Sequence, residues 1–190
     1  MSILIDSYSE AFADVNLYIK DLHPTAAAVD SAIGQCFTSK AGHRLRSVRF
    51  YLKKVLNPVG HLVAVLYAMT GTYGTDGKPT GAALATSDVV EMASLGAGYA
   101  LITFTFPAPY YPMNGGYYCI SCECSEKTTL DAANHVGMFF DNTAGTHSGN
   151  VYDFGSSVYF TYATKDAPFY VYGDKPIQAN LPKMAILGMI

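Results

Sequence analysis

The sequence contains no tryptophan, and only 14% of its 190 residues are charged. The 12 Lys and Arg against 15 Asp and Glu give a net charge of −3, without the basic cluster that marks a nucleic-acid-binding protein. Long apolar runs are also missing, since no segment approaches the roughly 20 residues of a membrane helix. We therefore expect neither a nucleic-acid partner nor a membrane partner.

The N-terminal residues MSILIDSYSEAF lack the basic segment of a secretory signal, and their apolar run stops at Asp6. This predicts that the chain carries no signal peptide. A protein made and assembled in a host cytoplasm and released by lysis would show this pattern. A domain cut from a longer secreted protein would show it too, so a virion location and an extracellular location both remain open.

The four cysteines, Cys36, Cys119, Cys122 and Cys124, do not form an evident disulfide framework. Three of them lie in CISCEC, which has strand character. Because successive side chains of a strand point to opposite faces, Cys122 and Cys124 share one face and Cys119 takes the other. This favours buried, reduced thiols over the two alternatives, a zinc site and a disulfide.

Half of the residues are hydrophobic, and 15 Tyr and 10 Phe favour strands. Short apolar runs alternate with turns rich in Gly, Pro and Asn, which is typical of all-β folds. We predict strands near residues 3–5, 15–19, 33–38, 45–54, 61–69, 87–92, 99–107, 116–124, 134–140, 149–153, 157–164 and 168–172. The pattern predicts an antiparallel β-sandwich, jelly-roll-like, with one domain over residues 1–173. Residues 1–20 would dock at its edge, and residues 174–190 would form an apolar C-terminal arm.

Alternation gives the direction of some side chains. Val48, Phe50 and Leu52 are predicted to point inward, and in ALITFTF the residues Ile102, Phe104 and Phe106 alternate with residues 101, 103 and 105. The run HLVAVLYAM is apolar on both faces, which is typical of a central strand. The best helical candidate, residues 23–34, offers one or two turns.

Reactive groups are scattered along the chain. The five histidines lie in separate predicted strands and turns, no G-x-S-x-G motif occurs, and the acidic residues adjoin turns. We therefore predict a protein that is not an enzyme, with no catalytic residues, cofactor or metal ligands. Residues 140–150, FDNTAGTHSGN, are oxygen-rich and leave calcium as an alternative to a plain turn.

Two sets of residues are candidate contact sites. The apolar ends of the chain are predicted to contact other subunits, because an apolar tail must be covered. An exposed tyrosine can also hold a sugar ring, since its apolar ring carries a polar tip. The predicted subunit contacts are Ile3, Leu4, Ile5, Met184, Ile186, Leu187, Met189 and Ile190, and the candidate glycan contacts are Tyr110, Tyr111 and Tyr117.

From about residue 33 to residue 162 the chain resembles β-sandwich proteins encoded by bacteriophages and environmental viral sequences. An FYLKK strand leads through NPVG into an LYA strand, followed by TGTYGT, PTG and LATSD, a TFTF strand, a GGYYC strand and a THSGN loop. The opening LIDSYSE is similar as well, whereas CISCEC and the C-terminal arm depart from the pattern. These motifs specify a fold better than a function.

The resemblance implies a structural protein of a phage-like virion, either a capsid decoration protein or a tail or fibre module. It carries over no catalytic residue. Such a protein would act by forming a homo-oligomer and docking on other virion proteins. The alternative is a carbohydrate-binding β-sandwich that recognises a glycan or a host receptor.

Overall fold

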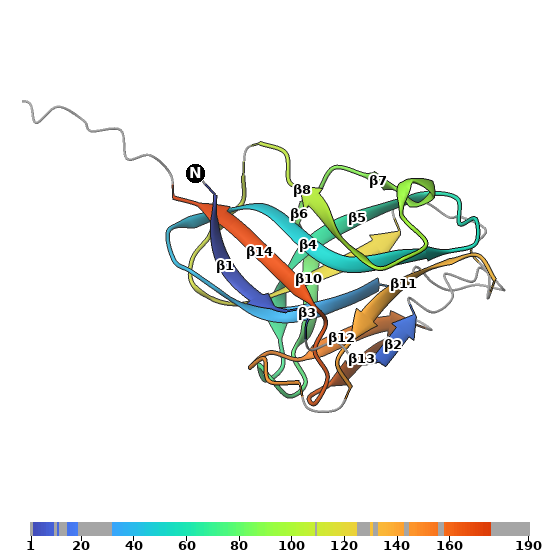
Figure 1. Cartoon of the computed structure of the whole chain (residues 1–190). Helices are drawn as coiled ribbons and strands as arrows, with labels where there is room; N and C mark the ends of the chain where they lie inside the picture. Colours follow the sequence, from blue (N-terminus) through green and yellow to red (C-terminus); the bar gives the residue numbers. More distant parts are fainter. Residues whose placement is uncertain are drawn as a thin grey trace, which may run out of the picture.

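The computed structural model describes residues 2–9, 11, 15–18, 32–108, 110–124, 130, 133–142, 145–155 and 158–175. These residues form two antiparallel sheets packed face to face, which confirms the predicted all-β sandwich (Figure 1). The first sheet contains β1 (Ile3–Tyr8), β2 (Val15–Tyr18), β4 (His43–Val55), β8 (Ala100–Thr105), β9 (Pro112–Met113), β11 (His135–Phe140) and β14 (Phe169–Asp174). The second contains β3 (Ala32–Ser39), β5 (His61–Thr70), β6 (Lys78–Thr86), β7 (Val90–Glu91), β10 (Gly116–Cys124), β12 (Val151–Gly155) and β13 (Val158–Tyr162).

The long strand β4 organises the first sheet. It pairs with β14 over residues 44–50 and with β11 over residues 52–55, while β8 pairs with residues 47–52. Since the β8 pairing overlaps both others, β14 and β11 follow one another along one edge of β4 and β8 lies on the other. Strand β1 then pairs with β14 and ends that side of the sheet.

The core lies between the two sheets and is rich in phenylalanine. Val48, Phe50 and Leu52 of β4 are fully buried, as the alternation predicts, and Phe104 and Phe106 join them. In β10, Cys122 and Cys124 face this core, whereas Cys119 faces a smaller cluster on the outer side of the second sheet. The predicted split of the cysteines between two faces is therefore confirmed.

The run HLVAVLYAM forms β5, which lies between β10 and β6 with residues 62–66 buried. The prediction of a central strand is confirmed. The sequence missed β6, because its residues KPTGAALAT lack alternation and carry the Gly and Pro of a turn. Strand β6 forms at the edge of the sheet by pairing with β5, and an edge tolerates its proline.

The predicted helix over residues 23–34 lies mostly outside the described residues. Its last three residues, 32–34, belong to β3, so the helical prediction was wrong there. Strand pairing with β10 and β12 decides the conformation of this segment. The 3-10 turn η2 (Met92–Ser94) is the only helical element that lies wholly within the described residues, and none of their helices is long and apolar enough to span a membrane.

Along one side of the sandwich, β1 of the first sheet approaches β3 of the second. Strand β12 covers β3 only as far as Gln35, so the N–H of Thr38 has no strand partner on that edge. The Asp6 carboxylate accepts this N–H at 2.8 Å, and Lys40 Nζ donates to the carbonyl of Leu4 at 3.1 Å. Side chains thus bridge the two sheets here, and a pocket with many polar side chains lies beside them.

Candidate functional site

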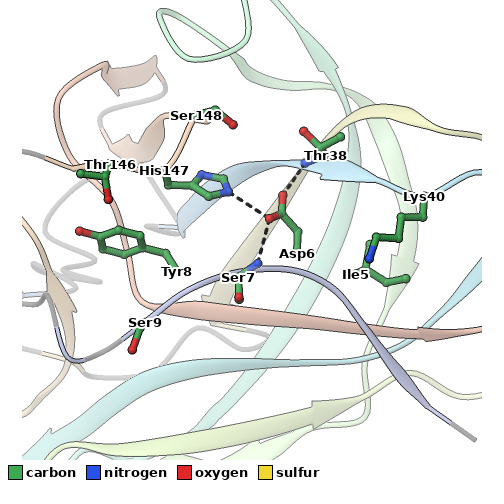
Figure 2. Close-up of a pocket in the computed structure, with 10 residues that line it drawn as sticks. All are labelled: Ile5, Asp6, Ser7, Tyr8, Ser9, Thr38, Lys40, Thr146, His147 and Ser148. Atoms are coloured by element: carbon green, nitrogen blue, oxygen red, sulfur yellow. Dashed lines mark hydrogen bonds and ion pairs between the residues drawn. The ribbon is translucent and has the colours of Figure 1, made fainter.

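A pocket of about 550 Å³ opens where β1 meets β3 (Figure 2). Most of its lining residues have polar side chains, with hydroxyl groups supplied from three separate segments. Its residues are Ile5, Asp6, Ser7, Tyr8 and Ser9 of the first segment, Thr38 and Lys40 of the second, and Thr146, His147 and Ser148 of the third. Sequence positions more than 100 residues apart therefore meet in one site.

Asp6 lies at the centre of the pocket because of a β-bulge. The register between β1 and β14 shifts between Leu4 and Asp6, which turns Ile5 into the core and leaves the Asp6 carboxylate facing β3. Its Oδ1 accepts the N–H of Ser7 at 2.9 Å and lies 3.2 Å from His147 Nε2, while Oδ2 accepts the N–H of Thr38. The carboxylate is fixed by three donors.

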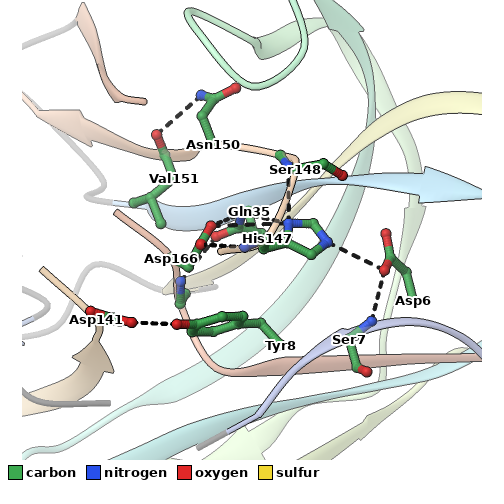
Figure 3. Close-up of polar contacts among 12 residues, drawn as sticks. Asp6, Ser7, Tyr8, Gln35, Asp141, His147, Ser148, Asn150, Val151 and Asp166 are labelled. Carbon is green, nitrogen blue, oxygen red and sulfur yellow. Dashed lines mark hydrogen bonds and ion pairs between the residues drawn. The ribbon is translucent and has the colours of Figure 1, made fainter. Parts of the chain in front are cut away.

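The imidazole of His147 is held at both nitrogens, as Figure 3 shows. Nδ1 accepts the N–H of Gly149 at 3.0 Å and lies 3.2 Å from the Gln35 amide nitrogen. Because Nδ1 faces two N–H donors, the proton of the neutral ring sits on Nε2 and is donated to Asp6. The side chain is 7% exposed, so the ring presents little of itself to solvent.

Gln35 and Asp166 hold the other side of the ring. The Gln35 amide donates to Asp166 Oδ1 at 3.0 Å and accepts the N–H of Ala167 at 3.0 Å, while Asp166 Oδ2 accepts the N–H of His147 at 2.9 Å. Burial raises the pKa of Asp166 above its ordinary value, although the His147 N–H and Gln35 act in the opposite direction. These two buried side chains fix the 145–149 turn against β3.

A second pair extends this network toward the interior. The Tyr8 hydroxyl donates to the Asp141 carboxylate, and Asp141 forms an isolated β-bridge with Asp166. Burial, followed by the Asp141 carboxylate, raises the pKa of Tyr8 well above its ordinary value. Tyr8 is therefore a neutral hydrogen-bond donor at physiological pH.

The chemistry of this arrangement is that of a fixed polar surface. A histidine acts as a general base through an unoccupied ring nitrogen within reach of the proton that it takes. Here both nitrogens of His147 have protein partners, and neither partner is a hydroxyl. The groups around Asp6 can accept or donate hydrogen bonds, and the imidazole positions Asp6.

An exposed tyrosine pair adjoins the pocket. Tyr117 stacks on Tyr73 with ring centroids 4.1 Å apart and an angle of 12° between the rings, and Tyr117 is still 51% exposed. The Tyr73 hydroxyl lies 3.1 Å from both Thr38 Oγ1 and Ser148 Oγ, two lining residues of the pocket. We call Tyr117 and Tyr73 the tyrosine platform, and it forms one surface with the pocket.

The structure separates the three tyrosines that the sequence offered as glycan contacts. Tyr117 lies on the outer face of the second sheet, as described above. Tyr111 packs on the core against Tyr118, at 6.4 Å between ring centroids, and Tyr110 lies under the guanidinium group of Arg46. Tyr110 and Tyr111 line a second pocket of about 400 Å³ beside the end of β6.

The predicted subunit contacts divide between exposed and buried positions. Ile3 and Leu4 are 37% and 44% exposed on the outer strand β1. Ile5 is buried in the core of its own chain, so it leaves the set of exposed apolar residues. The C-terminal candidates Met184, Ile186, Leu187, Met189 and Ile190 lie outside the described residues.

In residues 140–150, where calcium was the alternative to a plain turn, Asp141 and Asn150 bond to other groups of the protein. The Asp141 carboxylate accepts from Tyr8, and the Asn150 amide donates to the carbonyls of Gly77 and Val151. No three His, Cys, Asp or Glu side chains of the described ranges are grouped to hold a metal ion. Cys36 and Cys119 face each other at 3.4 Å between sulfur atoms as free, buried thiols, and burial raises the pKa of Cys119.

Sequence reasoning did not single out Asp6, His147 or Tyr73. A signal was nevertheless present: Asp6 belongs to LIDSYSE and His147 to THSGN, two of the motifs that carry the viral resemblance. The fold brings these motifs together across a separation of 141 residues. No protein-family model, curated protein or solved structure matches the chain, so the resemblance stays a prediction.

Proposed function

We propose that this protein is a non-enzymatic carbohydrate-binding β-sandwich. The observation that carries the proposal is the tyrosine platform beside a pocket of hydroxyl, carboxylate and ammonium groups. The pocket lies on a sandwich edge, where β1, β3 and the 145–149 turn, itself fixed by Gln35 and Asp166, supply its groups. A preformed site of this kind binds a ligand at a low cost in conformational entropy.

A sugar presents an apolar ring face and a rim of hydroxyl groups, and the site offers a match for each. The exposed face of Tyr117 can stack on the ring, since one face of a tyrosine suffices and the other rests on Tyr73. Asp6 Oδ2 accepts one N–H and keeps a second lone pair for a sugar hydroxyl. Lys40 and the hydroxyl groups of the pocket supply donors.

Glycan binding explains the acid and imidazole groups better than glycoside hydrolysis does. Glycosidases use two carboxyl groups about 5 to 9 Å apart across the scissile bond, one of them acting as an acid. In the pocket only Asp6 reaches the lining, and three N–H groups already face its two carboxyl oxygens. Asp166 and Asp141 are buried behind it and bonded to protein groups.

A glycan array probed with the labelled protein tests the proposal, and isothermal titration then measures the affinity for any sugar found. We expect Tyr117→Ala to weaken that binding by about tenfold or more, because the stacking surface is lost. Phe160→Ala is the matched control, since Phe160 is 50% exposed on the distant edge strand β13. An array without a bound glycan, or equal affinities in the Tyr117 variant and the wild type, would contradict the proposal.

The second candidate is a structural protein of a phage-like virion, which the exposed apolar side chains of β1 favour. Ile3 and Leu4 lie on the last strand of the first sheet, where an exposed apolar edge invites association. Such a protein would assemble with itself or dock on a capsid or tail, in a virion or outside the cell. A glycan-binding tip of a virion would combine both roles.

The mass of the protein in solution, measured by light scattering over a range of concentrations, tests this second role. We expect an oligomer that Leu4→Lys dissociates, while Val158→Lys, at a similarly exposed position of β13, leaves it intact. If the wild type is a monomer at every concentration, the result contradicts this role, because the role requires self-association.

A further inference from the structure

The outward side of β4 carries a row of cations, and each of them lies over a tyrosine ring. The Arg46 guanidinium is 3.7 Å from the ring centroid of Tyr110, and Arg44 is 5.6 Å from the same ring. Arg49 lies 5.3 Å from Tyr172, and Lys53 lies 4.5 Å from Tyr99. We call these four cations and three rings the cationic ladder.

The ladder has an excess of positive charge. Asp174 is the only carboxylate paired with the four cations within the described ranges, and it binds Arg44 at 3.0 Å and Arg46 at 3.3 Å. Arg49 instead donates to the hydroxyl of Thr103. Four cations and one anion give the ladder itself a net charge of +3, in a protein whose total charge is −3.

Further aromatic rings surround the cations. Tyr51 stacks on Tyr99 with centroids 5.4 Å apart, and Phe139 packs edge-on against Tyr99 at 4.7 Å. At the β14 side, Tyr170 and Tyr172 lie nearly parallel at 6.5 Å. All of these side chains are half-buried, so the face presents a firm layer of rings with charges on it.

We propose that the cationic ladder binds an extended anionic polysaccharide, one that carries carboxylate or sulfate groups. Charge complementarity sets the sign of the ligand, and guanidinium groups bind carboxylate and sulfate oxygens well. The ladder runs from Arg44 to Lys53, which is about 30 Å at the rise of a β-strand. A surface of that length fits several units of a linear chain rather than one sugar.

A polysaccharide fits this face better than a single-stranded nucleic acid does. Bases bind by inserting between or onto freely exposed rings, whereas the rings of the ladder are packed against one another and lie under cations. The carbohydrate needs only the flat contact and the local charge.

This inference stands apart from the proposed glycan pocket. The ladder belongs to β4, β14 and the segments beside β8, and it shares no residue with the pocket or with the tyrosine platform. Tyr117→Ala therefore leaves the ladder intact. Either proposal can fail while the other holds.

The experiment uses the full chain and measures binding to polygalacturonate and to heparin by isothermal titration at several salt concentrations. We expect binding that weakens steadily with salt, and an affinity about tenfold lower for Arg49→Gln combined with Lys53→Gln. Lys78→Gln with Lys175→Gln is the matched control, since it removes the same charge from positions outside the ladder. Thermal melting of both variants confirms that they are folded, and Lys53→Gln alone gives a milder second test.

Binding that the ladder variant loses and the control variant keeps supports the proposal. The proposal is overturned if neither polysaccharide binds, or if both double variants lose affinity equally, which would show a diffuse charge effect. A poly-dT oligonucleotide is the competing arm: tighter binding of poly-dT at the ladder would assign the face to single-stranded nucleic acid instead.

Discussion

Two groups of polar side chains differ in their surroundings, since one is buried and bonded to protein groups and the other lies at the surface. At the corner between β1 and β3, Asp6, Gln35, His147 and Asp166 are buried or nearly so, and each is bonded to fixed protein groups. On the outer face of β4, the cations of the ladder lie over rings at the surface, with a single carboxylate among them.

The difference teaches which polar groups stabilise the fold and which remain for a ligand. A buried donor that loses its partner costs free energy because water cannot replace it, whereas an exposed cation regains water at once. The buried groups of the corner network should therefore dominate stability, whereas the ladder should contribute little to stability and bind the anionic ligand. Each prediction below tests one side of this contrast.

The largest expected effect is that of Gln35→Leu. The change removes the acceptor of the Ala167 N–H and the donor to Asp166 Oδ1, both inside the protein. At about 1 to 3 kcal/mol for each buried group left without a partner, we expect the free energy of unfolding to fall by about 3 kcal/mol. Urea unfolding followed by circular dichroism measures it.

Thr38→Val is the control on the same strand, because Thr38 Oγ1 bonds only at the surface, to Tyr73. Its cost should stay below about 1 kcal/mol. Equal losses in the two variants would mean that the corner network is no more important for the fold than an ordinary surface hydrogen bond.

The second prediction concerns Asp166→Asn and pH. One oxygen of Asp166 becomes an amide that faces an N–H donor, of His147 or of Gln35, so we expect a loss of about 1 to 2 kcal/mol at pH 7. Burial raises the pKa of Asp166 in the folded protein above 3.8, its ordinary value and the one expected in the unfolded chain. At a pH between the unfolded and the folded pKa, the folded state therefore binds more protons than the unfolded state. The wild type therefore gains stability from Asp166 as the pH falls toward 4, and the variant does not.

The measurement is the difference in unfolding free energy between the wild type and Asp166→Asn at several values from pH 7 to pH 4. This difference should grow as the pH falls, because Asp166 titrates only in the wild type. The other acidic groups titrate in both proteins, so their contributions cancel. A difference that shrinks toward acid pH would show that Asp166 is stabilised in its charged form.

The sequence predicted the sheets better than the corner. Alternation correctly predicted that Val48, Phe50 and Leu52 are buried, because the direction of a side chain depends on the local period of its own strand. It could not place Asp6 beside His147, because that contact depends on a β-bulge at Ile5 and on where β12 stops covering β3. Strand β6 was not predicted for a similar reason, since its pairing with β5 decides its conformation although Gly and Pro disfavour a strand.

The candidate site was predicted only in part, and the part that failed is instructive. Tyr117 was predicted as a glycan contact, and it is exposed whereas its neighbour Tyr118 is buried, because adjacent strand residues face opposite ways. The three arginines of HRLRSVRF, Arg44, Arg46 and Arg49, form no basic cluster in the sequence. Their rings come from Tyr110 and Tyr172, which lie far away in sequence, so periodicity within β4 could not reveal the ladder.

The smallest expected effect closes the contrast. Arg49→Gln with Lys53→Gln removes two cations from the ladder, yet we expect the free energy of unfolding to change by less than about 1 kcal/mol. Each cation gives up one exposed contact with a ring, worth about 0.5 to 1 kcal/mol at such sites, and the row of like charges loses some repulsion in return. Urea unfolding at low and at high salt separates the two terms, because salt screens the repulsion. A loss as large as that of Gln35→Leu would place the ladder among the elements that hold the fold together, and the division between a stabilising corner and a binding face would then disappear.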